Sequence, residues 1–208
     1  MKSAILIILA LMLISACGSP EETAPEQARA TDSAPAPVVI DDTPVEALQI
    51  GGAIKTLQTA VDLSDPENAS WRDAQEYRMD LGLAPPVHPS INLRHDPTAP
   101  AIPVFLRAAS DGTRLYLRLR WPDDSENNSS SRTDFADGAA VQFSLGDAAT
   151  TSFMMGAPNG PVNIWYWKAG LTAPQNLAAG GFGGTTRVGQ AGLVSRSSYR
   201  EGGEWVVV

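Results

Sequence analysis

The chain has 208 residues, of which 43% are hydrophobic and 18% charged, and its formal net charge is −8. This length can bury one sizeable core, so we expect a single folded domain. A single cysteine is too few for an internal disulfide framework, a multi-thiolate iron–sulfur site or covalent haem attachment. The acidic balance argues against a nucleic-acid binder, which needs clustered cations to neutralise phosphates.

Residues 1–16 are typical of a secretory signal peptide. Lys2 precedes an unbroken apolar run from Ala4 to Ile14, which is too short to cross a bilayer as a mature helix. Small residues then lead to Cys17, an arrangement that resembles the bacterial lipobox, in which the thiol takes a diacylglycerol group. An ordinary signal peptide with an incidental cysteine is the alternative. We therefore expect a lipoprotein held on the periplasmic side of a bacterial membrane, with the outer membrane favoured.

Residues 17–46 are expected to be a disordered tether that starts at the lipidated cysteine. From Gly18 to Glu46 the chain has five prolines, seven acidic residues, one arginine and no aromatic residue. Such a composition cannot bury enough apolar surface to fold. The folded domain is then expected at residues 47–208.

The first clear elements of this domain are two strands. The runs Ala101–Ala108 and Arg114–Trp121 flank an Asp-Gly turn and predict a β-hairpin. In the second run the apolar residues alternate with arginines, so one face is expected to be buried. The other face, with Arg114, Arg118 and Arg120, is expected to meet solvent, although it could also pair haem propionates or a partner subunit.

Several shorter elements are predicted from the same kinds of pattern and composition. A short helix is predicted at Trp71–Leu83, started by Asn68 or Ser70. Residues 170–192, rich in Gly and Ala, are predicted as a loop. Further strands are predicted at Ala139–Leu145, Ser152–Met155 and Val162–Trp167.

The fold class predicted from these elements is all-β. Many short strands with closely spaced turns indicate an antiparallel β-sandwich or barrel, with a few short helices. The final run, Glu204–Val208, begins a strand but has no partner strand nearby in the sequence. We therefore expect the domain to be truncated at its C-terminus.

Polar residues offer two weak candidate sites. His88 and His95, the two histidines, are seven residues apart, which matches neither a helix face nor a strand face. Loop histidines are preferred to a metal site or to Ser-His-Asp catalysis. Acidic residues also flank a Ser/Asn-rich loop, where they could bind calcium or act as acid and base, but a solvated loop is preferred. These acidic residues are Asp123, Asp124, Glu126, Asp134 and Asp137.

Two methionines form the third candidate site. Met154 and Met155 immediately precede Gly156 at the end of a predicted strand. A thioether in this place is either core filler or an axial ligand of haem iron. The pattern alone leaves both open, and it makes Val162–Trp167 a buried aromatic strand.

An ordered set of segments carries a family resemblance. The segments are Leu106–Gly112 with Leu115–Asp124, Phe135–Phe143, Phe153–Gly156 and Pro161–Ala169. Together they resemble the haem-binding gamma subunits of ethylbenzene dehydrogenase and dimethylsulfide dehydrogenase type molybdoenzymes, in the dimethyl sulfoxide reductase superfamily. The resemblance runs in order from about Ala47 to Val208. It implies a β-sandwich that holds one non-covalent haem b through a methionine and a lysine.

The resemblance also implies which residues bind the haem. The family methionine falls in Phe153–Gly156, and Met155, beside the glycine, is chosen as the iron ligand with Met154 as second choice. The family lysine lies in a Gly-x-Lys stretch after a strand that begins like Glu204, so the second ligand is expected beyond Val208.

Three further residues are candidates for contact with the haem. Lys168 is a substitute for the family lysine, because a buried amine has a depressed pKa and a free lone pair. Trp165 and Trp167 share one strand face and suit either the sandwich core or a haem wall.

The expected function is that of an electron carrier and not of an enzyme. By resemblance, it exchanges electrons with a molybdopterin subunit through an iron–sulfur subunit, and it binds no nucleic acid. The alternative is a ligand- or carbohydrate-binding β-sandwich lipoprotein without haem. A hydrolase that depends on His88 or His95 is a third hypothesis.

Overall fold

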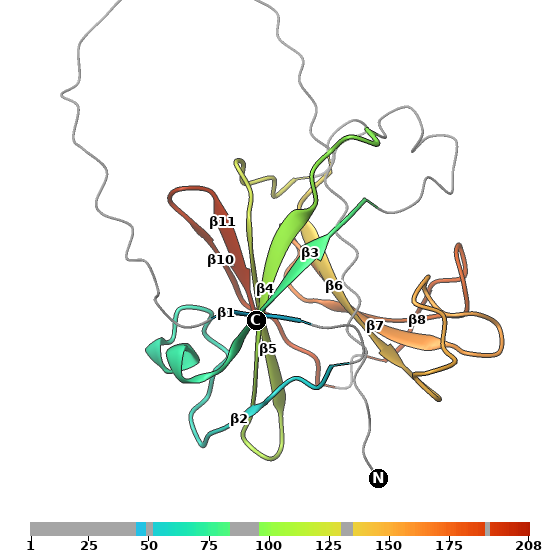
Figure 1. Ribbon diagram of the computed structural model, residues 1–208, viewed down its shortest axis with the longest axis horizontal. Helices are drawn as coiled ribbons and strands as arrows, with labels where there is room; N and C mark the ends of the chain where they lie inside the picture. The colour runs from blue at the N-terminus through green and yellow to red at the C-terminus, as the bar shows by residue number, and fades with distance from the viewer. Residues whose placement is uncertain (1–44, 49–51, 84–95, 130–134, 190–191) are drawn as a thin grey trace, which may run out of the picture.

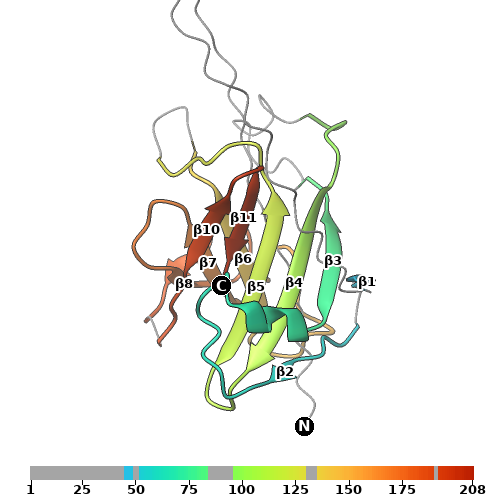
Figure 2. The ribbon, with the colours of Figure 1, turned by 90° about the vertical axis from the view of Figure 1, so that its left-hand side faces the viewer.

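The computed structural model describes residues 45–48, 52–83, 96–129, 135–189 and 192–208. This part of the chain forms two β-sheets that face one another (Figures 1 and 2), which confirms the predicted all-β sandwich. The predicted signal peptide, Cys17, nearly all of the tether, both histidines and Asp134 lie outside the described residues.

The larger sheet has the strand order β1-β3-β4-β5-β11-β10, and β2 pairs with β4. Neighbouring strands are antiparallel, except that β1 is parallel to β3 and β2 is parallel to β4. The strands are β1 (Val45–Ala47), β2 (Leu57–Gln58), β3 (Glu76–Leu81), β4 (Ile102–Ser110), β5 (Leu115–Pro122), β10 (Ser197–Arg200) and β11 (Glu204–Val207). β1 includes Val45 and Glu46, which sequence analysis assigned to the end of the tether.

The smaller sheet has the order β6-β7-β8-β9, with every neighbouring pair antiparallel. Its strands are β6 (Gly138–Ser144), β7 (Val162–Lys168), β8 (Gln175–Ala179) and β9 (Thr186–Arg187). Figure 2 shows this sheet as a second layer behind β5 and β11.

The predicted hairpin is confirmed as β4 and β5. The carboxylate of Asp111 accepts hydrogen bonds from the backbone N–H groups of Thr113 and Arg114, at 2.8 and 2.7 Å. Gly112 takes a φ of 89°, which suits glycine in this turn. Leu119 and Trp121 point into the core, as the alternation predicts.

Three tryptophans, one from each of three strands, fill the centre of the sandwich. The ring of Trp167 lies 6.0 Å from that of Trp121 and 5.0 Å from that of Trp205, between ring centroids. The indole Nε1 of Trp205 donates a 2.8 Å hydrogen bond to the buried carboxylate of Asp137. Both sheets therefore contribute to one aromatic core.

The predicted helix at Trp71–Leu83 is wrong. Asn68 does cap a helix, because its side chain accepts a hydrogen bond from the Ser70 backbone N–H at 2.9 Å. That helix is a short 3-10 turn, η1 (Ala69–Asp73), and the chain then enters β3. No helix in the described segments is long and apolar enough to cross a membrane.

The expectation that the arginine face of β5 meets solvent is wrong for two of its three arginines. Arg118 is 7% exposed and the side chain of Arg120 is 22% exposed. The segment from Asp62 to Glu76 covers this face: the Arg118 Nε donates to the Pro66 carbonyl at 2.8 Å. Arg114, at the start of the strand, is exposed as expected.

Three further predictions differ from the structure. Ser152–Met155 is a turn and not a strand, and residues 170–192 contain β8 and β9. The terminal strand β11 has partners on both sides, β5 and β10, contrary to the prediction of an unpaired strand. The pairing of β11 with β5 joins segments far apart in the chain, which local sequence patterns do not encode, whereas β10 and β11 are close in sequence.

Candidate functional site

The predicted site residues lie on both faces of β7. Val162 and Ile164 are buried on the outer face of the smaller sheet, in a cluster that includes Met155 and Tyr166. Trp167 alternates with them and packs into the core between the sheets. The structure therefore does not bring Met155 together with the two tryptophans.

Met155 has an unusual backbone conformation. Its φ is +59°, and among the described residues it is the one non-glycine residue with a positive φ. This conformation costs about 1–3 kcal/mol for a residue with a side chain, and such strain concentrates at functional sites. The surrounding loops fix it: the Met155 carbonyl accepts a 2.9 Å hydrogen bond from the Gly181 N–H.

Gly156 fixes the same turn from the other side. Its φ is +76°, and its N–H donates to the Ser152 carbonyl at 3.1 Å. An added Cβ would lie 2.7 Å from the Gly160 carbonyl oxygen and 3.2 Å from Val162 Cγ1. Glycine at this position therefore allows the close approach of the Gly160 backbone and of Val162.

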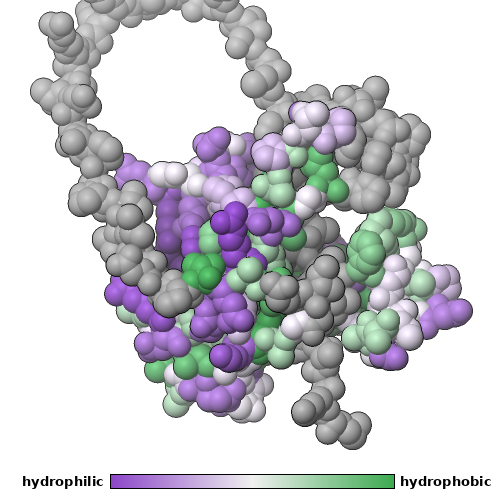
Figure 3. Space-filling view, viewed as in Figure 1, coloured by the Kyte–Doolittle hydropathy of each residue, from purple (hydrophilic) through white to green (hydrophobic). Residues whose placement is uncertain are grey.

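The outer face around Met155 is apolar and partly open. Half-buried Ala140, Tyr166 and Leu177 pack there beside Met155. Burial raises the pKa of the Tyr166 phenol, which keeps this group neutral at ordinary pH. On the surface in Figure 3, hydrophobic side chains gather on the lobe at the right of the view, where Figure 1 has the loops of the smaller sheet.

The other two predicted iron ligands are less well placed. Met154 is half-buried, and its backbone N–H donates to Ser152 Oγ at 3.2 Å, but its side chain is not part of the apolar cluster. Lys168 shares the outer face by alternation, but it lies at the opposite end of β7 from Val162.

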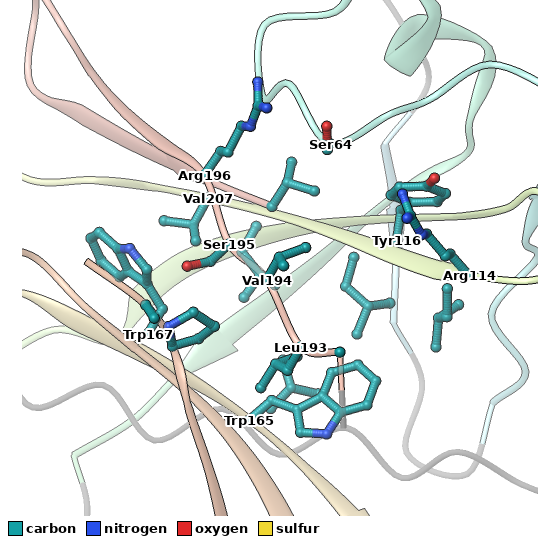
Figure 4. A pocket seen from close by; sticks show the side chains of 18 of the residues that line it. Ser64, Arg114, Tyr116, Trp165, Trp167, Leu193, Val194, Ser195, Arg196 and Val207 are labelled. Carbon is teal, nitrogen blue, oxygen red and sulfur yellow. The ribbon is translucent and has the colours of Figure 1, made fainter. Parts of the chain in front are cut away.

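Trp165 and Trp167 line a cavity of about 720 Å³ between the sheets (Figure 4). The Trp165 Nε1 donates to Asn163 Oδ1 at 2.8 Å, and its ring lies 4.4 Å from that of Phe143, between centroids. The smaller sheet separates this cavity from the outer face with Met155.

The acidic loop does not assemble a metal site in the described structure. No group of three His, Cys, Asp or Glu side chains there is close enough to hold an ion. Asp137 is instead a buried acceptor, with one oxygen that takes hydrogen bonds from Trp205 and from the Asn127 N–H. Burial raises the pKa of Asp123.

Sequence analysis missed Tyr166, Ala140 and Leu177 as neighbours of the methionine. One signal was present: the run Val162–Lys168 is apolar or aromatic at both odd and even positions. A strand with this pattern is covered on both faces, whereas a sandwich strand normally shows one polar face.

A family model for ethylbenzene dehydrogenase matches residues 68–206. The chain belongs to the ethylbenzene dehydrogenase gamma-subunit family. The match includes β3 to β8, with the Met155 turn and both faces of β7.

Curated members of this family are similar over about 70% of the chain. The dimethylsulfide dehydrogenase subunit gamma of Rhodovulum sulfidophilum is 38% identical over 151 residues, which cover 70% of this chain and 57% of that protein. The chlorate reductase subunit gamma of Ideonella dechloratans is 38% identical over 149 residues, which cover 71% of this chain and 59% of that protein. A putative respiratory nitrate reductase heme subunit of Haloferax mediterranei is 32% identical over 145 residues, which cover 69% of this chain and 50% of that protein. The chain thus spans between half and three fifths of these relatives.

Proposed function

We propose that this protein carries electrons through one non-covalent haem b, held on the outer face of the smaller sheet with Met155 as an axial ligand of the iron. The observation that carries the proposal is the strained turn at Met155. Its backbone is held at a φ of +59° while its side chain lies half-buried over an apolar sheet face. Strain of this kind persists only where the surroundings fix it, and it favours a positioned ligand over core filler.

The residues present fit one side of a haem. Half-buried Ala140, Tyr166 and Leu177 offer an apolar platform, and the Met155 thioether is the soft ligand that haem iron accepts. When bound, the haem supplies one-electron exchange, and a methionine ligand raises its reduction potential. Lys168, on the same sheet face as Met155 by alternation, stays a prediction for the second ligand. The role of Trp165 and Trp167 is to support the sheet from behind.

The partner proposal rests on the relatives. One is named as a subunit of a dehydrogenase and another as a subunit of a reductase. A shared subunit that serves both oxidation and reduction suits electron transfer better than substrate chemistry. We infer that this chain exchanges electrons with molybdopterin and iron–sulfur subunits. The lipid anchor at Cys17 and the periplasmic location stay predictions.

A haem titration tests the proposal. Full-length apoprotein is titrated with haemin and followed by its Soret absorbance, for the wild type and for Met155→Ala. We expect the wild type to bind one haem and Met155→Ala to bind at least tenfold more weakly, with an altered reduced spectrum. Met154→Ala is the matched control and should behave like the wild type.

Two results would contradict the proposal. Loss of binding in Met154→Ala, with Met155→Ala unaffected, would move the ligand to the second-choice methionine. A wild type that binds no haem would instead favour the ligand-binding lipoprotein without haem.

A further inference from the structure

The cavity between the sheets has no part in the proposed haem site. It lies on the inner face of β7, whereas Met155 packs on the outer face. Its volume of about 720 Å³ is within the range of small-molecule sites, roughly 300–1,000 Å³. Its walls come from both sheets and include Leu117, Leu119, Val141, Trp165, Trp167 and Val207.

The polar side chains beside the Trp165 wall are hydrogen-bonded in a chain. Trp165 Nε1 donates to Asn163 Oδ1 at 2.8 Å. Asn163 Nδ2 donates in turn to Asn176 Oδ1, and Asn176 Nδ2 donates to the Gly189 carbonyl, both at 2.6 Å. These groups satisfy one another, so the interior of the cavity suits an apolar body that makes no hydrogen bonds.

The rest of the cavity lining includes charged side chains. Arg114 and Arg196 are exposed and line the cavity together with Asp62. Neither arginine forms an ion pair within the described residues, in contrast to Arg120 and Arg200. The Arg114 guanidinium also meets the Tyr116 hydroxyl and the charge of Asp111, so Arg196 is the guanidinium that the described surroundings neutralise less. Figure 4 shows Arg196 and Arg114 apart from the two tryptophans, at different sides of the cavity.

Asp62 does not neutralise both arginines. Hydrogen bonds from Ser64 are the main cause that lowers the pKa of Asp62, and the charges of Arg114 and Arg196 lower it further. The carboxylate is thus ionised at neutral pH and held by the Ser64 N–H at 2.8 Å. At least one guanidinium stays available to a ligand anion.

We propose that this cavity binds a small hydrophobic monoanion, with its apolar body between the sheets and its single carboxylate at Arg114 or Arg196. An apolar interior next to unpaired guanidinium groups is the complement of such a molecule. Two classes of molecule have this chemistry: fatty acids and aromatic carboxylates. The site is independent of the haem.

Isothermal titration calorimetry on the full-length protein tests the proposal with three probes: decanoate, 2-naphthoate and 1-decanol. We expect at least one carboxylate to bind, and to bind at least tenfold more tightly than decanol. The tighter carboxylate identifies the class. In the double variant Arg114→Gln with Arg196→Gln, carboxylate affinity should fall at least tenfold and decanol affinity should stay the same.

A second variant, Leu117→Trp, fills the cavity and should abolish the binding of all three probes. The Soret spectrum serves as a separate readout in each variant and should not change, so failure here is distinguishable from failure of the haem proposal. The proposal is overturned if neither carboxylate binds the wild type, or if the double arginine variant binds carboxylate as tightly as the wild type. Because both arginines are exposed, this last comparison does not depend on whether Leu117→Trp folds.

Discussion

Met155 combines two properties that rarely occur together in one residue. Its backbone takes a left-handed conformation, which costs a residue with a Cβ about 1–2 kcal/mol, and glycine usually takes such positions. Its side chain is a thioether that packs over an apolar sheet face. A residue selected only for the turn would be glycine or asparagine, so the methionine at this position is best explained by its sulfur.

The strain can be measured in the protein without haem. We expect Met155→Gly to be about 1 kcal/mol more stable than Met155→Ala, because glycine relieves the positive φ and alanine does not. Urea unfolding of both variants gives the difference. At Met154, which has no positive φ, we expect the reverse: Met154→Ala should be more stable than Met154→Gly. A Met155→Gly variant less stable than Met155→Ala would remove the strain argument.

At the residue scale, sequence analysis found the chemistry but not its placement. Met155 and Gly156 stood out because a soft ligand precedes a residue that permits close approach. The positive φ depends on the hydrogen bond that the Met155 carbonyl accepts from the Gly181 N–H, which no local pattern encodes. The shared strand face of Trp165 and Trp167 suits either the core or a haem wall, and in the structure the smaller sheet lies between them and Met155.

At the element scale, the segment from Asp62 to Glu76 is held to the outer face of the larger sheet by a buried ion network. The Glu76 carboxylate, 2% exposed, accepts from Arg107 at 3.1 Å and from Arg120 at 2.7 Å. Arg120 also pairs with Glu204 at 2.8 Å, and Arg200 joins Glu204 to Glu67. These contacts connect β3, β4, β5, β10 and β11.

This network predicts a pH-dependent stability. Burial raises the pKa of Glu76, but hydrogen bonds and charges from Arg120 and Arg107 outweigh it and lower the pKa below its ordinary value of 4.5. A carboxyl with a lowered folded pKa stabilises the fold above its unfolded pKa, and this contribution is lost as pH falls through the folded pKa. We expect Glu76→Gln to lose about 3–5 kcal/mol of unfolding free energy at pH 7, because two guanidinium groups lose their partner.

Denaturant unfolding from pH 7 to pH 3 checks this prediction. The gap between the wild type and Glu76→Gln should narrow below pH 4.5, where the wild type loses the same charge. Asp80→Asn is the matched control, since the Arg78–Asp80 pair is about half exposed and should contribute about 1 kcal/mol or less. Equal losses in the two variants would show that the network does not hold the segment.

Sequence patterns predicted elements well where the pattern is local. The β4–β5 hairpin, β6 and β7 follow from period-two alternation and turn residues. The alternation in β5 distinguishes its two faces, but it does not say what covers the arginines, so their burial was missed. The predicted helix at Trp71–Leu83 overlooks the alternation within β3, where Tyr77, Met79 and Leu81 share one face. The pairing of β11 with β5, in contrast, is non-local.

At the scale of the whole molecule, the smaller sheet separates two different environments. Its inner face forms the aromatic core and the cavity with the larger sheet, while its outer face bears the Met155 turn. The proposed electron carrier would gain from this arrangement, because the sandwich fixes the Met155 turn and the outer face is partly open. Family membership and this geometry support the same function from independent observations.

The most direct test is a potentiometric titration of the haem-loaded full-length protein and of Met155→His, with Met154→His as control. A thioether ligand raises the reduction potential of haem, and exchange for imidazole removes that effect. We expect Met155→His to bind haem with a clearly lower midpoint potential than the wild type, and Met154→His to leave the potential unchanged. An unchanged potential in Met155→His would contradict iron ligation by Met155.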